Sequence, residues 1–82
     1  MNAATSVDLR GMNADEGVMM LERFLDVSSM ANLKTVTVIH GKGTGILRQA
    51  VQDALKKDRR VASFRLGRWG EGDLGVTVVE LK

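Results

Sequence analysis

The residue types best suited to phosphate chemistry are concentrated in one stretch of the sequence, VTVIHGKGTGILR. β-Branched residues typical of a strand come first, glycines at alternate positions follow, and an apolar pattern typical of a helix begins directly after them. A strand that ends in a glycine loop at the start of a helix leaves backbone N–H groups unpaired at the positive end of the helix dipole. We therefore predict a phosphate-binding loop formed by Gly41, Lys42, Gly43, Thr44, Gly45 and Arg48.

The glycine spacing, G-x-G-x-G, matches neither the P-loop nor the dinucleotide-binding motif. Alone, it fits equally well a tight strand-to-helix turn in which glycines adopt positive φ. The only histidine, His40, directly precedes the loop, and histidine ordinarily exchanges a proton near neutral pH. We therefore predict that His40 acts as an acid or base on a bound phosphate. The alternative is a histidine that only pairs with the backbone at a strand end.

Length and composition limit the classes of protein that this chain can represent. Its 82 residues suffice for one small domain and are too few to enclose a deep active site. There is no cysteine, which excludes disulfides and thiolate metal sites, and no segment resembles a signal peptide or a membrane span. We expect a cytoplasmic protein with no membrane partner.

The charge is distributed unevenly along the chain. The net charge is +2, but residues 1–33 contain five acidic and two basic residues, whereas residues 34–82 contain ten basic and five acidic residues. The basic part includes the glycine loop, which favours nucleic acid as a partner. Solvated surface lysines and arginines explain the charge equally well.

Hydrophobic periodicity predicts the element order βαβαββ, with strands at residues 6–10, 34–39, 61–66 and 75–81 and helices at 14–30 and 46–57. Asn13 and Glu16 form a capping-box pattern before the first helix, and Asn32 is a suitable stop. Two strand-helix-strand units place both helices on one face of the sheet. We expect an α/β fold, more closely an α+β two-layer sandwich, spanning residues 6–82 after a disordered start or linker at residues 1–5. Methionines at helical spacing usually fill a core, so we interpret three residues of the first helix as core, Met19, Met20 and Met30.

Asp8 and Arg10 lie on one face of the first predicted strand, near its end. Carboxyl ends of parallel strands meet at one sheet edge, so we expect both residues beside His40. Asp8 could orient the imidazole or bind a hydrated Mg²⁺ ion, and the alternative is a surface ion pair with Arg10. A two-metal site requires several carboxylates, and Glu71 and Asp73 would contribute only if their loop folds over. We therefore expect no assured metal ligand set, with Mg²⁺ or Mn²⁺ as candidate ions.

The segment before the last strand, GRWGEGDLG at residues 67–75, predicts a long glycine-rich hairpin loop. Arg68 and Trp69 in this loop are predicted to contact nucleic acid, the tryptophan by stacking on a base. Packing of Trp69 against its own loop is the alternative.

Three motifs together resemble the Smr (small MutS-related) domain: VDLRG at residues 7–11, HGKGTGILR at residues 40–48 and GVTVVEL at residues 75–81. Many members have histidine at the position of Arg10. With arginine there, this sequence is most similar to the C-terminal domain of the second bacterial MutS family. That family is associated with suppression of homologous recombination and not with mismatch repair. The resemblance implies a four-stranded mixed sheet with two helices, similar to the C-terminal domain of translation initiation factor three. The last strand would lie antiparallel between the second and third. It also implies a C-terminal fragment of a larger, dimerising MutS-like chain.

The resemblance further implies a nicking endonuclease that hydrolyses phosphodiester bonds in DNA, including branched DNA, with catalytic residues that match Asp8, Arg10 and His40. Relatives are associated with RNA cleavage or ribosomes. The alternatives are therefore an RNA-cleaving domain and a non-catalytic module that binds nucleic acid or the ribosome. A third alternative is a protein-docking domain, which predicts an exposed apolar patch on the helical face. Asp73 interrupts the G-G-x-G sequence found in relatives.

Overall fold

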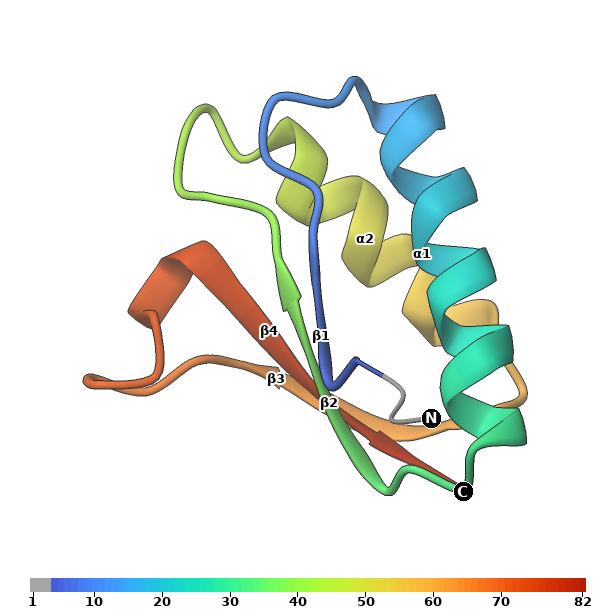
Figure 1. The fold of residues 1–82 in the computed structure, drawn as a ribbon. Coiled ribbons are helices and arrows are strands. Elements are labelled where there is room, and N and C mark those ends of the chain that lie inside the picture. Colours follow the sequence, from blue (N-terminus) through green and yellow to red (C-terminus); the bar gives the residue numbers. More distant parts are fainter. Residues whose placement is uncertain (1–3) are drawn as a thin grey trace.

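Two helices cover one face of a four-stranded sheet in the computed structural model, which describes residues 4–82 (Figure 1). The two predicted helices have the predicted bounds, and the predicted α/β two-layer fold is confirmed. The elements are β1 (Ser6–Asp8), α1 (Ala14–Met30), β2 (Thr35–Ile39), α2 (Ile46–Lys57), β3 (Val61–Leu66), the short 3₁₀ helix η1 (Asp73–Gly75) and β4 (Val76–Leu81).

The strands are ordered β1-β2-β4-β3 across the sheet. β1 is parallel to β2, whereas β4 is antiparallel to both β2 and β3. The last strand therefore lies between the second and third, as the family resemblance implied. A consequence is that β4 ends, and β1 begins, at the sheet end opposite to the one where β2 enters the glycine loop (Figure 1).

Local interactions fix both ends of α1. The Asn13 side chain accepts a hydrogen bond from the Glu16 N–H at 2.9 Å, and the Glu16 carboxylate accepts one from the Asn13 N–H at 3.3 Å. This is the predicted capping box. After the helix, Asn32 adopts a φ of 59°, and the Leu33 N–H donates to the Ser28 carbonyl at 3.0 Å. This hydrogen bond belongs to a Schellman motif, in which asparagine tolerates the left-handed conformation.

The core lies between the helices and the sheet, and its buried members are Leu9, Leu21, Leu25, Val36, Val38, Val51, Leu55, Val79 and Leu81. The interpretation of the α1 methionines as core is wrong. Met19 and Met30 are 72% and 77% exposed, and Met20 is also exposed. The reason is that the buried side of α1 is already formed by another stripe, Gly17, Leu21, Leu25 and Ser28.

The expected disordered start falls only partly within the described structure, because residues 1–3 lie outside it. Ala4 and Thr5 are exposed, and the Thr5 carbonyl accepts a hydrogen bond from the Thr37 N–H at 2.9 Å. Within residues 4–82, no helix is both long enough and apolar enough to cross a bilayer.

Candidate nucleic-acid interface

The glycine loop connects the end of β2 to the start of α2. The Gly75 carbonyl accepts hydrogen bonds from the N–H groups of His40, at 3.0 Å, and Gly41, at 2.9 Å. These two bonds anchor the start of the loop to the residue that precedes β4. Gly41 and Gly45 have φ values of 81° and 86°, which residues with a side chain rarely adopt, so both positions require glycine.

Beyond Gly41, the loop leaves its amides free. Within residues 4–82, no acceptor bonds to the backbone N–H groups of residues 42–45, 47 and 48, and α2 has no side-chain cap. These N–H groups lie at the positive end of α2. The loop lines a depression of about 170 Å³, together with His40 and Arg48. An anion in this depression would find free donors and a favourable helix dipole, which are the two properties predicted for a phosphate loop.

His40 is buried under this loop, with only 5% of the residue exposed. Its Nδ1 lies 2.9 Å from the Gly41 carbonyl oxygen, and its Nε2 lies 2.9 Å from Thr77 Oγ1. Because a carbonyl oxygen only accepts, Nδ1 must carry the proton and donate it, and the Thr77 hydroxyl then donates to Nε2 in the neutral ring. Both ring nitrogens are therefore engaged within the protein.

Thr77 is a site residue that the sequence reasoning did not identify. It lies in β4, is fully buried, and holds the imidazole from the side opposite to Gly41. The available signal was weak: Thr77 is the one hydroxyl residue in the apolar motif GVTVVEL, at a position that alternation places inward with Val79. Nothing in the spacing connects it to a histidine 37 residues earlier.

Asp8 and Arg10 form a closely paired unit beside the glycine loop. Arg10 Nη2 donates to Asp8 Oδ2 at 2.7 Å, Nε donates to Oδ1 at 3.0 Å, and the Arg10 N–H also donates to Oδ1 at 3.0 Å. The side-chain hydrogen bond from Arg10 lowers the pKa of Asp8 from 3.8 to about 2. A Cβ placed on Gly41 would lie 3.4 Å from Arg10 Cγ, so the arginine stem runs alongside the start of the loop.

The expected contact between Asp8 and His40 is not formed. Asp8 pairs with Ile39, on the face of the sheet away from the helices, because the alternate residue Val38 belongs to the core. His40 bonds to Thr77, which pairs with Val38 and therefore faces the helices. The prediction that Asp8 orients the imidazole is wrong, because Gly41 and Thr77 occupy both ring nitrogens.

Two cations lie at the loop itself. Lys42 Nζ is 3.6 Å from Asp73 Oδ2, so the loop before β4 does fold over the glycine loop. Arg48 Nη2 would lie 3.0 Å from a Cβ placed on Gly45, which puts its guanidinium over the end of the loop. Both side chains can move toward an anion, since an exposed pair such as Lys42 with Asp73 is weak.

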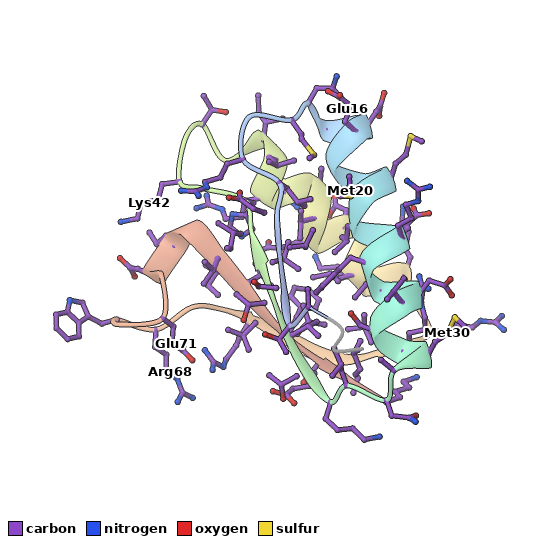
Figure 2. All side chains as sticks on the ribbon, viewed as in Figure 1. Glu16, Met20, Met30, Lys42, Arg68 and Glu71 are labelled. Atoms are coloured by element: carbon purple, nitrogen blue, oxygen red, sulfur yellow. The ribbon has the colours of Figure 1, made fainter. Side chains whose placement is uncertain are left out.

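Arg68 and Trp69 lie outside the depression, on the loop between β3 and β4. Glu71 braces this loop by accepting hydrogen bonds from the Arg68 N–H, at 2.7 Å, and from Arg65 Nη1, at 2.8 Å. These interactions, led by the Arg65 side chain, lower the pKa of Glu71 from 4.5 to about 2. Trp69 is 94% exposed, so it does not pack against its own loop. Figure 2 shows Lys42, Arg68 and Glu71 on one side of the molecule, opposite to Met20 and Met30.

The family model described as the Smr domain matches residues 7–82. The chain belongs to the Smr domain family. The identification suggested by the three motifs is therefore confirmed. In this Smr domain, two of the motifs form β1 and β4, which are the two neighbours of β2, and the third forms the glycine loop that follows β2.

Curated relatives of this Smr domain include "Endonuclease MutS2" of Clostridium novyi, which is 56% identical over 81 residues, covering 99% of this chain. "Endonuclease MutS2" of Acetivibrio thermocellus is 49% identical over 79 residues, covering 96% of the chain. In both cases the match spans only 10% of the relative's length.

Solved structures give the same family. The crystal structure of the Smr domain of Thermus thermophilus MutS2 superposes with a TM-score of 0.94 at 44% identity, covering 96% of this chain and 99% of that one. YdaL, a stand-alone small MutS-related protein from Escherichia coli, superposes with a TM-score of 0.90 at 25% identity, covering 95% of this chain and 64% of that one.

In the part of this Smr domain that the structure describes, the side chains do not form a metal-binding cluster. Among residues 4–82, no three histidine, aspartate or glutamate side chains gather in a way that could hold an ion. Both oxygens of Asp8 accept hydrogen bonds from Arg10, Glu71 is bound to Arg65, and Asp73 is near Lys42. These carboxylates are therefore not arranged to bind a divalent cation unless another molecule supplies further ligands.

Proposed function

We propose that this Smr domain is a nicking endonuclease that hydrolyses phosphodiester bonds in DNA. The observation that carries the proposal is the row of unbonded N–H groups at the start of α2, above a histidine and between cations. The name endonuclease carried by relatives that are about half identical supports the same activity. Those relatives are much longer than this chain, so their activity is extended here to the domain as a proposal.

In the proposed reaction, the loop amides hold a backbone phosphate while a water molecule attacks the phosphorus. The bond between phosphorus and the leaving oxygen breaks, and the water proton must leave as the leaving oxygen gains one. Lys42 and Arg48 line the depression and can stabilise the negative charge that develops on the phosphoryl oxygens. Arg10 does not line it, but its stem runs beside Gly41, and we propose that its guanidinium assists them. Asp8 acts through Arg10, because its carboxylate holds the guanidinium beside Gly41.

His40 is the proposed proton carrier, and its geometry defines how it must act. It exchanges a proton with the substrate only if one of its two hydrogen bonds is released. The Gly41 carbonyl is the partner that can move more easily, because Gly41 is only half-buried and leads into the exposed residues 42–44, whereas Thr77 is fully buried in β4. Phosphate binding to the loop would release Nδ1. To act there, the ring must carry a proton on Nε2 that is donated to the Thr77 oxygen; the imidazolium can then give its Nδ1 proton to the leaving oxygen, and the proton of the attacking water passes to solvent.

Flanking nucleotides would bind to the loop between β3 and β4. The exposed Trp69 ring can stack on a base, a contact that typically contributes about 1–3 kcal/mol, and Arg68 can contact the next phosphate.

We further propose that the substrate is cytoplasmic DNA, including branched DNA, and that the activity suppresses homologous recombination. We also propose that the domain acts as part of a larger dimeric MutS-like chain. The last assignment is supported by the relatives named MutS2, because the match spans only 10% of their length.

A second candidate is a module that binds DNA, RNA or the ribosome without cleaving nucleic acid. The engagement of both His40 nitrogens and the pairing of Asp8 with Arg10 favour it, because these groups then stabilise the loop and need perform no chemistry. The same amides and cations would hold the backbone. Binding in both cases should weaken steeply with salt.

The test compares nicking of supercoiled plasmid with binding of the same DNA, for the wild type and for His40→Gln. Glutamine keeps a polar group near the Thr77 hydroxyl but cannot carry a proton in catalysis. Loss of nicking by about 10²–10⁴-fold with binding retained supports the enzyme, since that is the usual contribution of acid-base catalysis. Binding without nicking by a nuclease-free wild type supports the module and refutes the enzyme.

The same assay should be run with a chelator, with Mg²⁺ and with Mn²⁺, on duplex DNA, branched DNA and RNA. Activity only with an added ion would mean that the substrate supplies the ligands that the protein lacks. Preferential cleavage of RNA would refute the assignment of DNA as substrate while leaving the phosphodiesterase activity intact.

A further inference from the structure

The outer side of α1 exposes more apolar surface than a solvated helix face requires. Its exposed apolar residues are Met19, Met20, Val27 and Met30. Part of this surface lines an open groove of about 680 Å³, which is four times the volume of the depression at the glycine loop. Exposed apolar surface that is grouped on one face commonly marks a contact with another molecule.

The spacing of this surface is that of a helix-packing seam. Glu16, Met20, Arg23, Val27 and Met30 follow each other at alternating intervals of four and three residues, and we call these five residues the outer seam. Such spacing places side chains in one narrow row along a helix, where a second helix packs. The buried stripe of α1 is separate, so contact with the rest of this domain does not explain the outer seam.

The charges around the outer seam define the partner. Asp15, Glu22 and Asp26 lie along one side of it, and Glu16 lies within it, whereas Arg23 is the only basic residue of α1. Arg60 also lines the groove, but it is bound to Asp58, at 2.8 Å, and to Asp26, at 3.4 Å. A partner with positive flanks would therefore be favoured over one with negative flanks.

A second copy of α1 fits poorly for the same reason. In an antiparallel pair centred on the seam, Arg23 would face the Arg23 of the other copy, and the acidic flanks would repel each other. Like charges brought together at an interface oppose association.

We propose that the outer seam of α1 is a docking site for a basic amphipathic helix, with apolar residues at heptad spacing and lysine or arginine on its flanks. Met20 and Met30 provide adaptable apolar contacts, since methionine side chains are flexible and polarisable. The seam lies on the side of the molecule opposite to Lys42 and Arg68 (Figure 2), so a docked helix leaves the glycine loop open. This inference is independent of the proposed nuclease activity.

The test uses a fluorescent probe peptide of about 18 residues, with leucine at heptad a and d positions and lysine elsewhere. Fluorescence anisotropy should give saturable binding with a dissociation constant on the order of 10–100 μM, because the contact is smaller than a standard interface. Affinity should fall as salt is added. A peptide with glutamate in place of lysine, and one with the same composition in shuffled order, should not bind.

Two substitutions test the seam directly. Met20→Glu and Met30→Glu together should weaken binding by about tenfold or more, because they put charge into the apolar contact. Both side chains are exposed, so the fold should be retained. Leu74→Glu, the same type of change at an exposed residue of η1, is the matched control and should leave peptide affinity unchanged. Glu22→Lys should weaken the lysine peptide and allow the glutamate peptide to bind.

Four outcomes would overturn the proposal. One is the absence of saturable binding by the lysine peptide, and another is equal affinity for the lysine and glutamate peptides. The third is wild-type peptide affinity in the methionine double variant. A concentration-dependent dimer that Met20→Glu disrupts, seen by sedimentation, would assign the seam to a second copy instead.

Discussion

Replacing Thr77 with valine removes one buried hydroxyl group and keeps the shape of the side chain. In the wild type, this hydroxyl lies 2.9 Å from His40 Nε2 and donates to it. After the replacement, Nε2 is buried beside a methyl group. A shift of the proton from Nδ1 to Nε2 does not repair the loss, because the Gly41 carbonyl then loses its donor and Nε2–H has no acceptor.

The expected cost follows from this geometry. A buried polar group left without a partner costs about 1–3 kcal/mol of unfolding free energy. For a domain of this size, each kcal/mol lowers the melting temperature by about 4–8 °C. Thr77→Ser keeps the hydroxyl and loses one methyl group, which is worth about 1 kcal/mol, so it separates the hydrogen bond from the packing.

Two measurements check the expectation. Urea unfolding followed by far-ultraviolet circular dichroism gives the free energy; Trp69 fluorescence is less suitable because this ring is already 94% exposed in the folded state. Imidazole nitrogen chemical shifts then report the tautomer, and they need no assignment because His40 is the only histidine. The neutral ring of the wild type should show Nδ1 protonated and Nε2 without a proton.

A Thr77→Val variant as stable as the wild type would refute the reasoning, and so would a wild-type ring protonated at Nε2. The first result would mean that the hydroxyl does not hold the imidazole. The second would mean that Nδ1 does not donate to the Gly41 carbonyl, because the Thr77 oxygen can also accept a hydrogen bond from Nε2–H. The proposed release of Nδ1 during phosphate binding would then lose its basis.

Two further predictions concern stability. Gly67→Ala should destabilise the domain by about 1–3 kcal/mol, because a Cβ there would lie 2.8 Å from the backbone oxygen of Asp73, which is less able to move aside than a side chain. Urea unfolding measures the loss of stability, and a variant as stable as the wild type would contradict the prediction. The pKa values of Asp8 and Glu71 are held at about 2 in the folded state, below their ordinary 3.8 and 4.5, so their stabilising effect is complete above the ordinary values and is lost as the pH falls toward 2. The melting temperature should therefore fall in this range, and by less in Glu71→Gln; equal pH profiles for variant and wild type would show that Glu71 does not contribute.

Where the sequence predicted structure correctly, the determinants are local. Asn13 and Glu16 are three residues apart, and together with Asn32 they were sufficient to place both ends of α1. The glycine loop was predictable for the same reason, since strand, glycines and helix follow one another directly. The position of β4 between β2 and β3 came from the family resemblance, because alternation along a strand does not specify its neighbours.

The errors have a common physical cause, which is that they depend on contacts between distant segments. The ring nitrogens of His40 are held by Gly41 and by Thr77, and the second partner is brought near only by the pairing of β2 with β4. The α1 methionines were misplaced because that helix carries two apolar stripes. Periodicity detects both, but a single sheet can cover only one of them.

The start of β1 and the end of β4 lie at the same end of the sheet, and this arrangement has a mechanical consequence. Force applied between the start of β1 and the end of β4 would open the β1–β2 ladder, which has three residue pairs, from its first pair onward. Hydrogen bonds loaded in sequence break one at a time, as in a zipper, whereas a ladder pulled in shear bears the load on all its bonds together. A stretched tether should therefore unravel this domain from β1 at low force, before the load reaches the glycine loop at the far end.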